Sequence, residues 1–124
     1  MLNIRILVVD DEPDIRRICR ILLETGGYTV LEAATGAEAV EQVRQHPELD
    51  LILMDIMMPV MDGYEAARRI RKLADPVHAN KPIIAMTANA FEEDVKAALA
   101  AGMNEHLSKP IRIELLYEIM KKYL

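Results

Sequence analysis

The chain is 124 residues long, 52% of its residues are apolar, 28% are charged, and its formal net charge at pH 7 is −5. This length and composition exclude a disordered chain and predict one globular domain over residues 1–124, with a core of its own. The acidic charge argues against direct binding to nucleic acid, because phosphate backbones are bound by an excess of lysine and arginine.

The sequence also bears on where the protein works. Its single cysteine, Cys19, excludes an internal disulfide and fits a reducing compartment, and we expect this side chain to be a small buried apolar group. The N-terminus lacks the pattern of a signal peptide, and no apolar run approaches the length that spans a membrane. We therefore expect a cytoplasmic protein that does not insert into a membrane.

Short apolar runs that suit buried strands alternate with amphipathic stretches that suit helices. The first run, Ile4–Val9, is rich in β-branched residues, and the helix that begins at Pro13 ends at the glycine pair 26–27. The rest of the first half predicts a strand at Tyr28–Leu31, a helix at Ala37–Gln45 and a strand at Leu51–Met54.

The second half of the chain continues this alternation. Pro59 and the Asp62–Gly63 pair break the chain before a helix from Gly63 to about Leu73, and Asp75–Lys81 is predicted to be a loop. Beyond it we predict a strand at Pro82–Met86, a helix at Phe91–Ala101, a strand at Glu105–Ser108 and a closing helix at Ile113–Tyr123. Right-handed crossovers between such units give an α/β fold, a doubly wound parallel sheet of five strands with helices on both faces.

Polar side chains follow four of the five predicted strands. Asp10 and Asp11 come after the first strand and Asp55 after the third, while Thr87 and Lys109 follow the fourth and fifth. Because the carboxyl ends of parallel strands meet at one edge of a sheet, we expect these side chains to converge. Three neighbouring carboxylates repel one another unless they are protonated or neutralised, and Mg²⁺ prefers such oxygen ligands. The pattern predicts a cradle for a tetrahedral anion around Asp55.

Such a site allows attack by the Asp55 carboxylate on a phosphoryl group, which gives an aspartyl phosphate. Because a carboxylate is a weak nucleophile, the metal and Lys109 would position the donor and neutralise the charge that develops on the phosphoryl oxygens. Thr87 could then donate a hydrogen bond to the bound phosphate.

Four motifs occur in order, each at the end of a predicted strand. They are VVDDEP at 8–13, LILMDIMMPVMDG at 51–63, PIIAMTANA at 82–90 and SKP at 108–110. With these motifs the chain resembles a response-regulator receiver domain of the chemotaxis-regulator type over essentially its whole length. The resemblance implies a flavodoxin-like fold with strand order 2-1-3-4-5. The stretch ANAFEED at 88–94 is similar to receivers attached to hybrid histidine kinases.

The resemblance also implies a role for each residue of the site. Asp55 corresponds to the phosphoacceptor, and Asp10 and Asp11 to the acidic pair that organises Mg²⁺. The backbone carbonyl of Met57 corresponds to a further metal ligand, and Mn²⁺ is expected to substitute for Mg²⁺. Lys109 corresponds to the lysine that pairs with the phosphate.

The sequence departs from the family where the signal leaves the site. Thr87 corresponds to the switch hydroxyl, but His106 stands where the family usually carries a tyrosine or phenylalanine that turns inward. An imidazole titrates near neutral pH and resists burial when charged. We therefore expect inward movement to require the neutral ring, so that activation weakens below about pH 6. Met57 and Asn89 lie where the family varies its rate of dephosphorylation.

The family implies partners as well. The phosphoryl donor is expected to be a sensor histidine kinase or a histidine phosphotransfer protein. A downstream protein is expected to bind the face formed by Phe91–Ala101, Glu105–Ser108 and Ile113–Tyr123. In this interpretation the chain is a signalling domain that assists its own phosphorylation and dephosphorylation. The sequence fits both a free-standing regulator and the receiver of a larger kinase.

Other interpretations compete with this one. Asp10 and Asp11 could simply cap the first helix, and Asp55 could belong to an ordinary turn. A Mg²⁺-dependent phosphohydrolase could use the same aspartyl intermediate, but such enzymes typically place an acid where this chain has Met57. A flavin or nucleotide carrier would need a glycine-rich phosphate loop, whereas the DDEP stretch would repel phosphate. The convergence of four strand ends favours the signalling domain.

Overall fold

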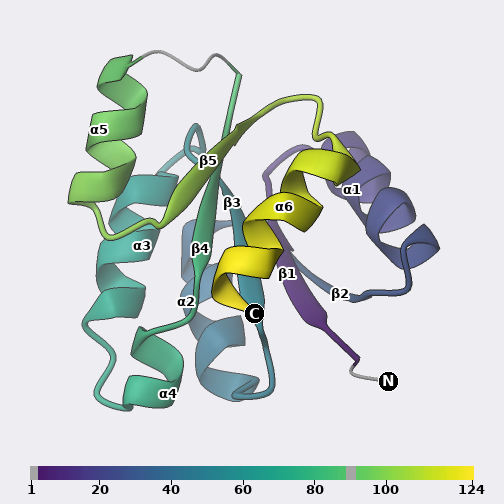
Figure 1. Cartoon of the computed structure of the whole chain (residues 1–124). Coiled ribbons are helices and arrows are strands. Elements are labelled where there is room, and N and C mark those ends of the chain that lie inside the picture. The colour runs from purple at the N-terminus through teal and green to yellow at the C-terminus, as the bar shows by residue number, and fades with distance from the viewer. Residues whose placement is uncertain (1–2, 89–91) are drawn as a thin grey trace.

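Strands and helices alternate along the computed structural model, which describes residues 3–88 and 92–124 (Figure 1). The strands are β1 (Arg5–Val9), β2 (Thr29–Ala33), β3 (Leu51–Asp55), β4 (Ile83–Thr87) and β5 (Glu105–Ser108). The helices are α1 (Pro13–Thr25), α2 (Gly36–Gln45), α3 (Gly63–Arg71), α4 (Pro76–Ala79), α5 (Glu92–Ala100) and α6 (Ile113–Tyr123). Across the described residues, none of the helices has the length and apolar character needed to cross a membrane.

The strands form one parallel sheet in the order β2-β1-β3-β4-β5. The central pairings place Ile6 of β1 opposite Val30 of β2 on one side and Leu51 of β3 on the other. Every strand therefore points its carboxyl end toward the same edge of the sheet. The predicted α/β class, with a doubly wound, flavodoxin-like sheet of this strand order, is confirmed.

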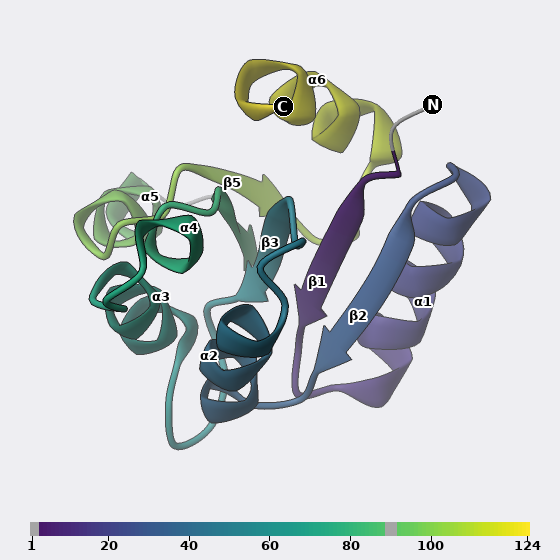
Figure 2. The ribbon, with the colours of Figure 1, turned by 90° about the horizontal axis from the view of Figure 1, so that it is seen from below.

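Helices cover both faces of the sheet (Figure 2). Ile6 and Val8 belong to the cluster packed under α1 and α6, whereas Leu7 and Val9 belong to the cluster packed under α2, α3 and α5. This two-sided burial explains why the inner strands β1, β3 and β4 are nearly continuous apolar runs instead of alternating patterns. Cys19 is buried in the first cluster as expected, and burial, with a smaller effect of the nearby Asp10 carboxylate, raises the pKa of its thiol to about 11.

The segment predicted to be a loop, Asp75–Lys81, contains a one-turn helix, so the prediction was wrong at Pro76–Ala79. Asp75 caps this helix, because its Oδ1 accepts a hydrogen bond from the Val77 N–H at 2.9 Å. Arg71 of α3 donates to the carbonyl of Ala79, the last residue of α4, and to the carbonyl of Lys81, each at 2.7 Å. An Asp-Pro pair is both a turn signal and a helix-start signal, and here the contact with α3 favours the helix.

Four strands differ from their predicted bounds by one or two residues. β1 begins at Arg5, one residue after the predicted start, and β3 ends at Asp55, one residue beyond the predicted end. β2 continues to Ala33, beyond the predicted end at Leu31, because its last residues still pair with β1. β4 begins at Ile83 and extends to Thr87, which pairs with Ser108 of β5. Pairing with a neighbouring strand, which the local sequence does not encode, sets these ends.

Candidate functional site

The polar residues that were expected to converge lie at the carboxyl-terminal edge of the sheet. Asp10 follows β1 directly, and Asp55 is the last residue of β3. The register places Asp55 opposite Met86, one residue before Thr87 at the end of β4. Lys109 follows β5, and its N–H donates to the carbonyl of Thr87 at 2.7 Å. Four strand ends therefore meet in one site.

Three carboxylates form the centre of this site. One oxygen each from Asp10, Asp11 and Asp55 lie within 4.8 Å of one another. Asp10 is fully buried and Asp55 is 3% exposed, while Asp11 is partly exposed. Burying two carboxylates side by side is unfavourable unless a cation or hydrogen-bond donors compensate. The helix-cap interpretation does not account for them, because the N-cap residue of α1 is Glu12, whose own side chain makes no capping hydrogen bond.

Each buried acid uses one oxygen to hold its own loop and directs the other toward Lys109. Asp10 Oδ1 accepts from the Glu12 N–H at 3.0 Å, and Asp55 Oδ1 accepts from the Met57 N–H at 3.1 Å. The Lys109 Nζ lies 2.8 Å from Asp10 Oδ2 and 3.4 Å from Asp55 Oδ2. One ammonium group therefore contacts both buried carboxylates.

These contacts change the protonation equilibria of the site. Burial raises the pKa of Asp55 and the charge of Asp10 adds to this, whereas the Met57 N–H and the Lys109 ammonium act in the opposite direction. Burial alone would lower the pKa of Lys109, but the Asp10 and Asp55 carboxylates outweigh it, and the pKa of Lys109 is raised. Lys109 is therefore charged at neutral pH.

Thr87 presents a buried hydroxyl at the same edge. The residue is 1% exposed, and its Oγ1 has no hydrogen-bond partner among residues 3–88 and 92–124. Buried polar atoms nearly always have a partner. An oxygen-rich anion bound at the strand ends would accept a hydrogen bond from this hydroxyl.

The loop between β3 and α3 folds back against the end of the strand that carries Asp55. A side chain at position 63 would run into the backbone carbonyl of Asp55, so only Gly63 allows this approach. The Gly63 N–H donates to the Ile56 carbonyl at 3.2 Å, and Asp62 Oδ1 caps α3 by accepting from the Glu65 N–H at 2.9 Å. The sequence predicted a chain break at this pair, but not its contact with the strand.

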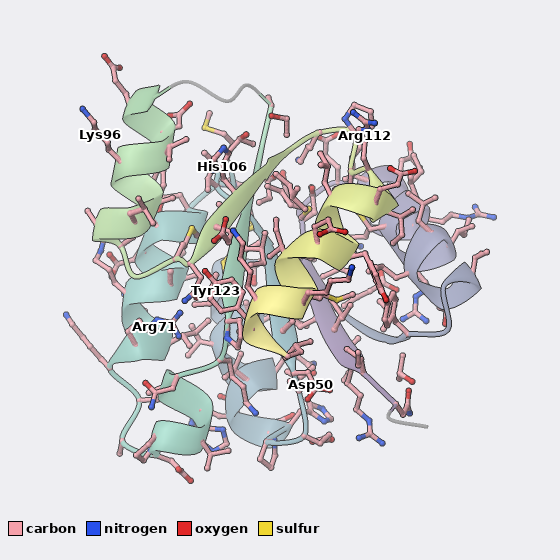
Figure 3. All side chains as sticks on the ribbon, in the orientation of Figure 1. Asp50, Arg71, Lys96, His106, Arg112 and Tyr123 are labelled. Carbon is pink, nitrogen blue, oxygen red and sulfur yellow. The ribbon has the colours of Figure 1, made fainter. Side chains whose placement is uncertain are left out.

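The remaining predicted site residues lie farther out. The Met57 side chain is 73% exposed beside Asp55, and Asn89 lies outside the described residues. His106 is half-buried on β5, opposite Ala85 of β4, and Figure 3 shows its ring on the α5 side of the strand. Two hollows adjoin His106, one of about 250 Å³ toward α5 and one of about 390 Å³ toward the start of α6.

One contact of the site has no signal in the sequence. The Arg16 Nη1 donates to the backbone carbonyl of Asp10 at 2.6 Å, and its Nε donates to Glu32 Oε1 at 3.2 Å. Glu32 becomes a neighbour of Arg16 only because β2 pairs with β1, which residue spacing along the chain does not reveal.

The residues present fit a hard divalent cation. Asp10, Asp11 and Asp55 offer carboxylate oxygens, which are the ligands that Mg²⁺ prefers, and the carbonyl of Met57 lies on the loop that follows Asp55. Two of these acids are buried, so a bound cation would relieve a repulsion that Lys109 alone balances only in part.

The sequence matches the family described as response regulator receiver domain over residues 6–121. It is 42% identical over 123 residues to the two-component response regulator ORR41 of rice, covering 97% of this chain and 94% of that protein. It is 39% identical over 122 residues to the signal transduction histidine-protein kinase BarA of Escherichia coli, covering 98% of this chain but 13% of the kinase.

Solved structures agree with these relatives. The chemotaxis protein CheY4 of Vibrio cholerae has a TM-score of 0.88 at 30% identity, over 99% of this chain and all of that one. The receiver domain of sensor histidine kinase PA1611 from Pseudomonas aeruginosa, with magnesium coordinated in its active-site cleft, has a TM-score of 0.86 at 38% identity, over 98% of both chains. A yeast complex of the histidine phosphotransfer protein Ypd1 with the Ssk1 receiver domain gives a TM-score of 0.83 at 29% identity, over 98% of this chain and 88% of that one.

Proposed function

The chain belongs to the response regulator receiver domain family, and on that premise we propose that it accepts a phosphoryl group on Asp55 with the help of Mg²⁺. It would act as a single receiver domain over residues 1–124. Its phosphorylation would be a signalling event within a two-component pathway, not turnover of an external substrate.

The contact of Lys109 with two buried acids carries this proposal. The lysine lies 2.8 Å from Asp10 and 3.4 Å from Asp55, so positive charge is already present where phosphoryl oxygens would arrive. Asp55 is the acid that follows the central strand β3, and its loop opens to solvent at the exposed Met57. Asp10 is fully buried, which suits a metal ligand better than a nucleophile.

The proposed reaction is an exchange of one phosphoryl bond for another. A carboxylate oxygen of Asp55 attacks the phosphorus of a phosphohistidine, an O–P bond forms, and the P–N bond breaks, with its electron pair leaving on the donor's imidazole. Asp10, Asp11, Asp55 and the Met57 carbonyl would hold Mg²⁺, which would supply positive charge that balances the phosphoryl oxygens. The ammonium of Lys109 pairs with the same oxygens from the opposite side.

The bound phosphate would then change the outer face of the domain. The Thr87 hydroxyl, which has no hydrogen-bond partner among the described residues, would shift toward the phosphate and donate to one of its oxygens. This shift of Thr87 would open room for His106 to turn inward from β5. The affected face is formed by α5, β5 and α6, where Leu99 and Leu115 line the hollows beside His106 and are 56% and 46% exposed. A downstream protein would bind this face, because exposed apolar side chains mark such surfaces.

Two relatives support the choice of phosphoryl donor. The chain resembles a part of the sensor kinase BarA, and it shares its fold with a receiver crystallised with a histidine phosphotransfer protein. We infer that the donor is a histidine kinase or a phosphotransfer protein of this kind. Both donors present a phosphohistidine on a protein surface, which suits an acceptor that lies at an open edge of the sheet.

Beryllium fluoride tests the site without a partner, because it forms a tetrahedral adduct that imitates a phosphoryl group on a carboxylate. We expect the wild type to bind it only with Mg²⁺, and NMR to show shifts at the amides of Asp55, Thr87 and His106. Asp55→Asn should lose the adduct, whereas Asp50→Asn, at the opposite edge of the sheet (Figure 3), should keep it. An adduct that persists in Asp55→Asn would contradict the proposed acceptor.

The same measurement tests the role of His106. A charged imidazole resists burial, so the shifts that the mimic causes on β5 should shrink as the pH falls from about 7.5 to about 5.5. His106→Phe places the usual ring of the family at this position, and this ring carries no charge. The shifts in this variant should therefore be the same at both pH values, and an equal pH dependence in both proteins would exclude the histidine as the cause.

A further inference from the structure

The turn that carries Asp10 and Asp11 is held in place by an arginine of the helix that follows it. Arg16 lies in the second turn of α1, and its side chain is only 17% exposed. We infer that Arg16 is a positioning residue for the two metal-binding acids, which it orients through the backbone of Asp10. This inference rests on the proposed function, because it concerns the Mg²⁺ site of that function.

Both backbone polar groups of Asp10 are tied to the edge strand β2. Its N–H donates to the carbonyl of Ala33 at 3.1 Å. Its carbonyl accepts from Arg16 Nη1 at 2.6 Å, and the Nε of the same guanidinium donates to Glu32 Oε1 at 3.2 Å. The peptide group before Asp10 is therefore held through its N–H and the peptide group after it through its carbonyl, which fixes the backbone of Asp10 and with it the start of the turn that carries both carboxylates.

A second arginine holds the acid that orients the first. The Arg20 Nε donates to Glu32 Oε2 at 2.7 Å, and its Nη2 donates to the carbonyl of Val30 at 3.2 Å. Glu32 thus receives one arginine on each oxygen. The planar fork of Arg16 can reach a carbonyl and a carboxylate at once, which the single ammonium of a lysine cannot do in the same geometry.

Positioning and simple charge predict opposite effects of removing Arg16. A positive charge beside three carboxylates repels an incoming cation, so its loss should tighten Mg²⁺ binding if charge alone mattered. If Arg16 positions Asp10 and Asp11, its loss should weaken Mg²⁺ binding, because groups that orient metal ligands typically contribute about 10- to 100-fold in affinity. The sign of the change therefore distinguishes the two explanations.

The test is calorimetric titration of the unphosphorylated protein with Mg²⁺. We expect Arg16→Gln and Arg16→Lys to bind Mg²⁺ about tenfold more weakly than the wild type. Arg17→Gln removes the same charge from an exposed neighbour on α1 and is the matched control. It should bind Mg²⁺ within about twofold of the wild type.

A second readout separates positioning from a general loss of stability. Raising the Mg²⁺ concentration about tenfold should restore phosphorylation of Arg16→Gln by a small acyl-phosphate donor, because only the metal affinity is impaired. Thermal unfolding of the metal-free proteins identifies variants that are merely less stable. Arg16→Lys keeps the charge and serves if Arg16→Gln does not fold.

Unchanged or tighter Mg²⁺ binding in both Arg16 variants would overturn the inference. If the wild type still binds Mg²⁺ and is phosphorylated on Asp55, the proposed function stands and only the role of Arg16 is wrong. If the wild type itself binds no Mg²⁺ at millimolar concentrations, the proposed function and the inference are both wrong.

Discussion

Asp55 is buried beside another acid, an arrangement that favours cation binding but destabilises the metal-free fold. Burial first, and then the charge of Asp10, raises the pKa of Asp55 despite the opposing Lys109 and Met57 N–H. A carboxyl group whose pKa is higher in the folded than in the unfolded protein makes the folded state bind more protons. Ionisation of Asp55 therefore destabilises the metal-free fold, and a bound cation relieves this cost.

This argument predicts a pH dependence of stability. Because the pKa of Asp55 is higher in the folded than in the unfolded chain, its protonation stabilises the fold. This stabilisation is fully present below the unfolded pKa and is lost as the pH rises through the folded pKa. In metal-free protein, Asp55→Asn should therefore become more stable relative to the wild type as the pH rises from about 4 to 7. Urea unfolding at several pH values measures this difference.

The control for this prediction is saturating Mg²⁺. The bound ion should stabilise the wild type more than Asp55→Asn, because binding to the folded state alone raises its stability. The advantage of the variant should then shrink or reverse. An advantage that is constant across pH in metal-free protein would show that the ionisation of Asp55 does not limit stability.

The loop between β3 and α3 contains a strained residue. Val60 is fully exposed and has a backbone φ of 66°, a left-handed conformation that β-branched side chains rarely adopt. Val60→Asn should raise the free energy of unfolding by about 1 kcal/mol, since asparagine tolerates this conformation. The midpoint temperature of thermal unfolding should rise by about 4 °C.

The matched control is Val77→Asn, in the regular backbone of the short helix α4, where the valine is 53% exposed. This substitution should be neutral or slightly destabilising, because asparagine is no better than valine inside a helix. Equal effects at positions 60 and 77 would show that backbone strain is not the cause.

Arg71 joins elements that are distant in the sequence. It donates to the carbonyls of Ala79 and Lys81. Its Nε also donates to the Gly102 carbonyl and its Nη2 to Asn104 Oδ1, both at 2.8 Å, in the connection between α5 and β5 (Figure 3). Burial lowers the pKa of this guanidinium. Arg71→Met should cost about 3 kcal/mol of unfolding free energy, because four partly buried acceptors lose their donor.

Arg68→Met on the same helix provides the comparison, because Arg68 forms an exposed pair with Glu65 at 3.1 Å. Exposed pairs of this kind contribute little, so its unfolding free energy should change by less than about 0.5 kcal/mol. Chemical denaturation of both variants checks the difference. If Arg71→Met were as stable as Arg68→Met, the connection of α3 to α5 and β5 would not depend on this side chain.

For the molecule as a whole, the parts that local pattern determines could be predicted from the sequence. Continuous apolar runs indicated strands covered on both faces, and this alternation of strands and helices is what the sheet shows. The helix α4 and the exact ends of β1, β2, β3 and β4 were missed, because contacts with Arg71 or with neighbouring strands decide them.

Some residues of the candidate site could also be predicted from the sequence, and others could not. Asp10, Asp55, Thr87 and Lys109 could be predicted to meet because each follows a parallel strand, and parallel strands end at one edge. The hydrogen bond between Arg16 and Glu32 could not be predicted, since these two residues become neighbours only in the folded sheet. Their chemical roles, unlike their positions, stay predictions until they are measured.

The most direct test of the proposed function is the intact mass of the protein after incubation with Mg²⁺ and a small acyl-phosphate donor. We expect the wild type to gain the mass of one phosphoryl group, and expect Asp55→Asn and a metal-free sample to gain none. Peptide mapping should locate the group on Asp55. A phosphoryl group that is added without Mg²⁺, or equally to Asp55→Asn, would contradict the account.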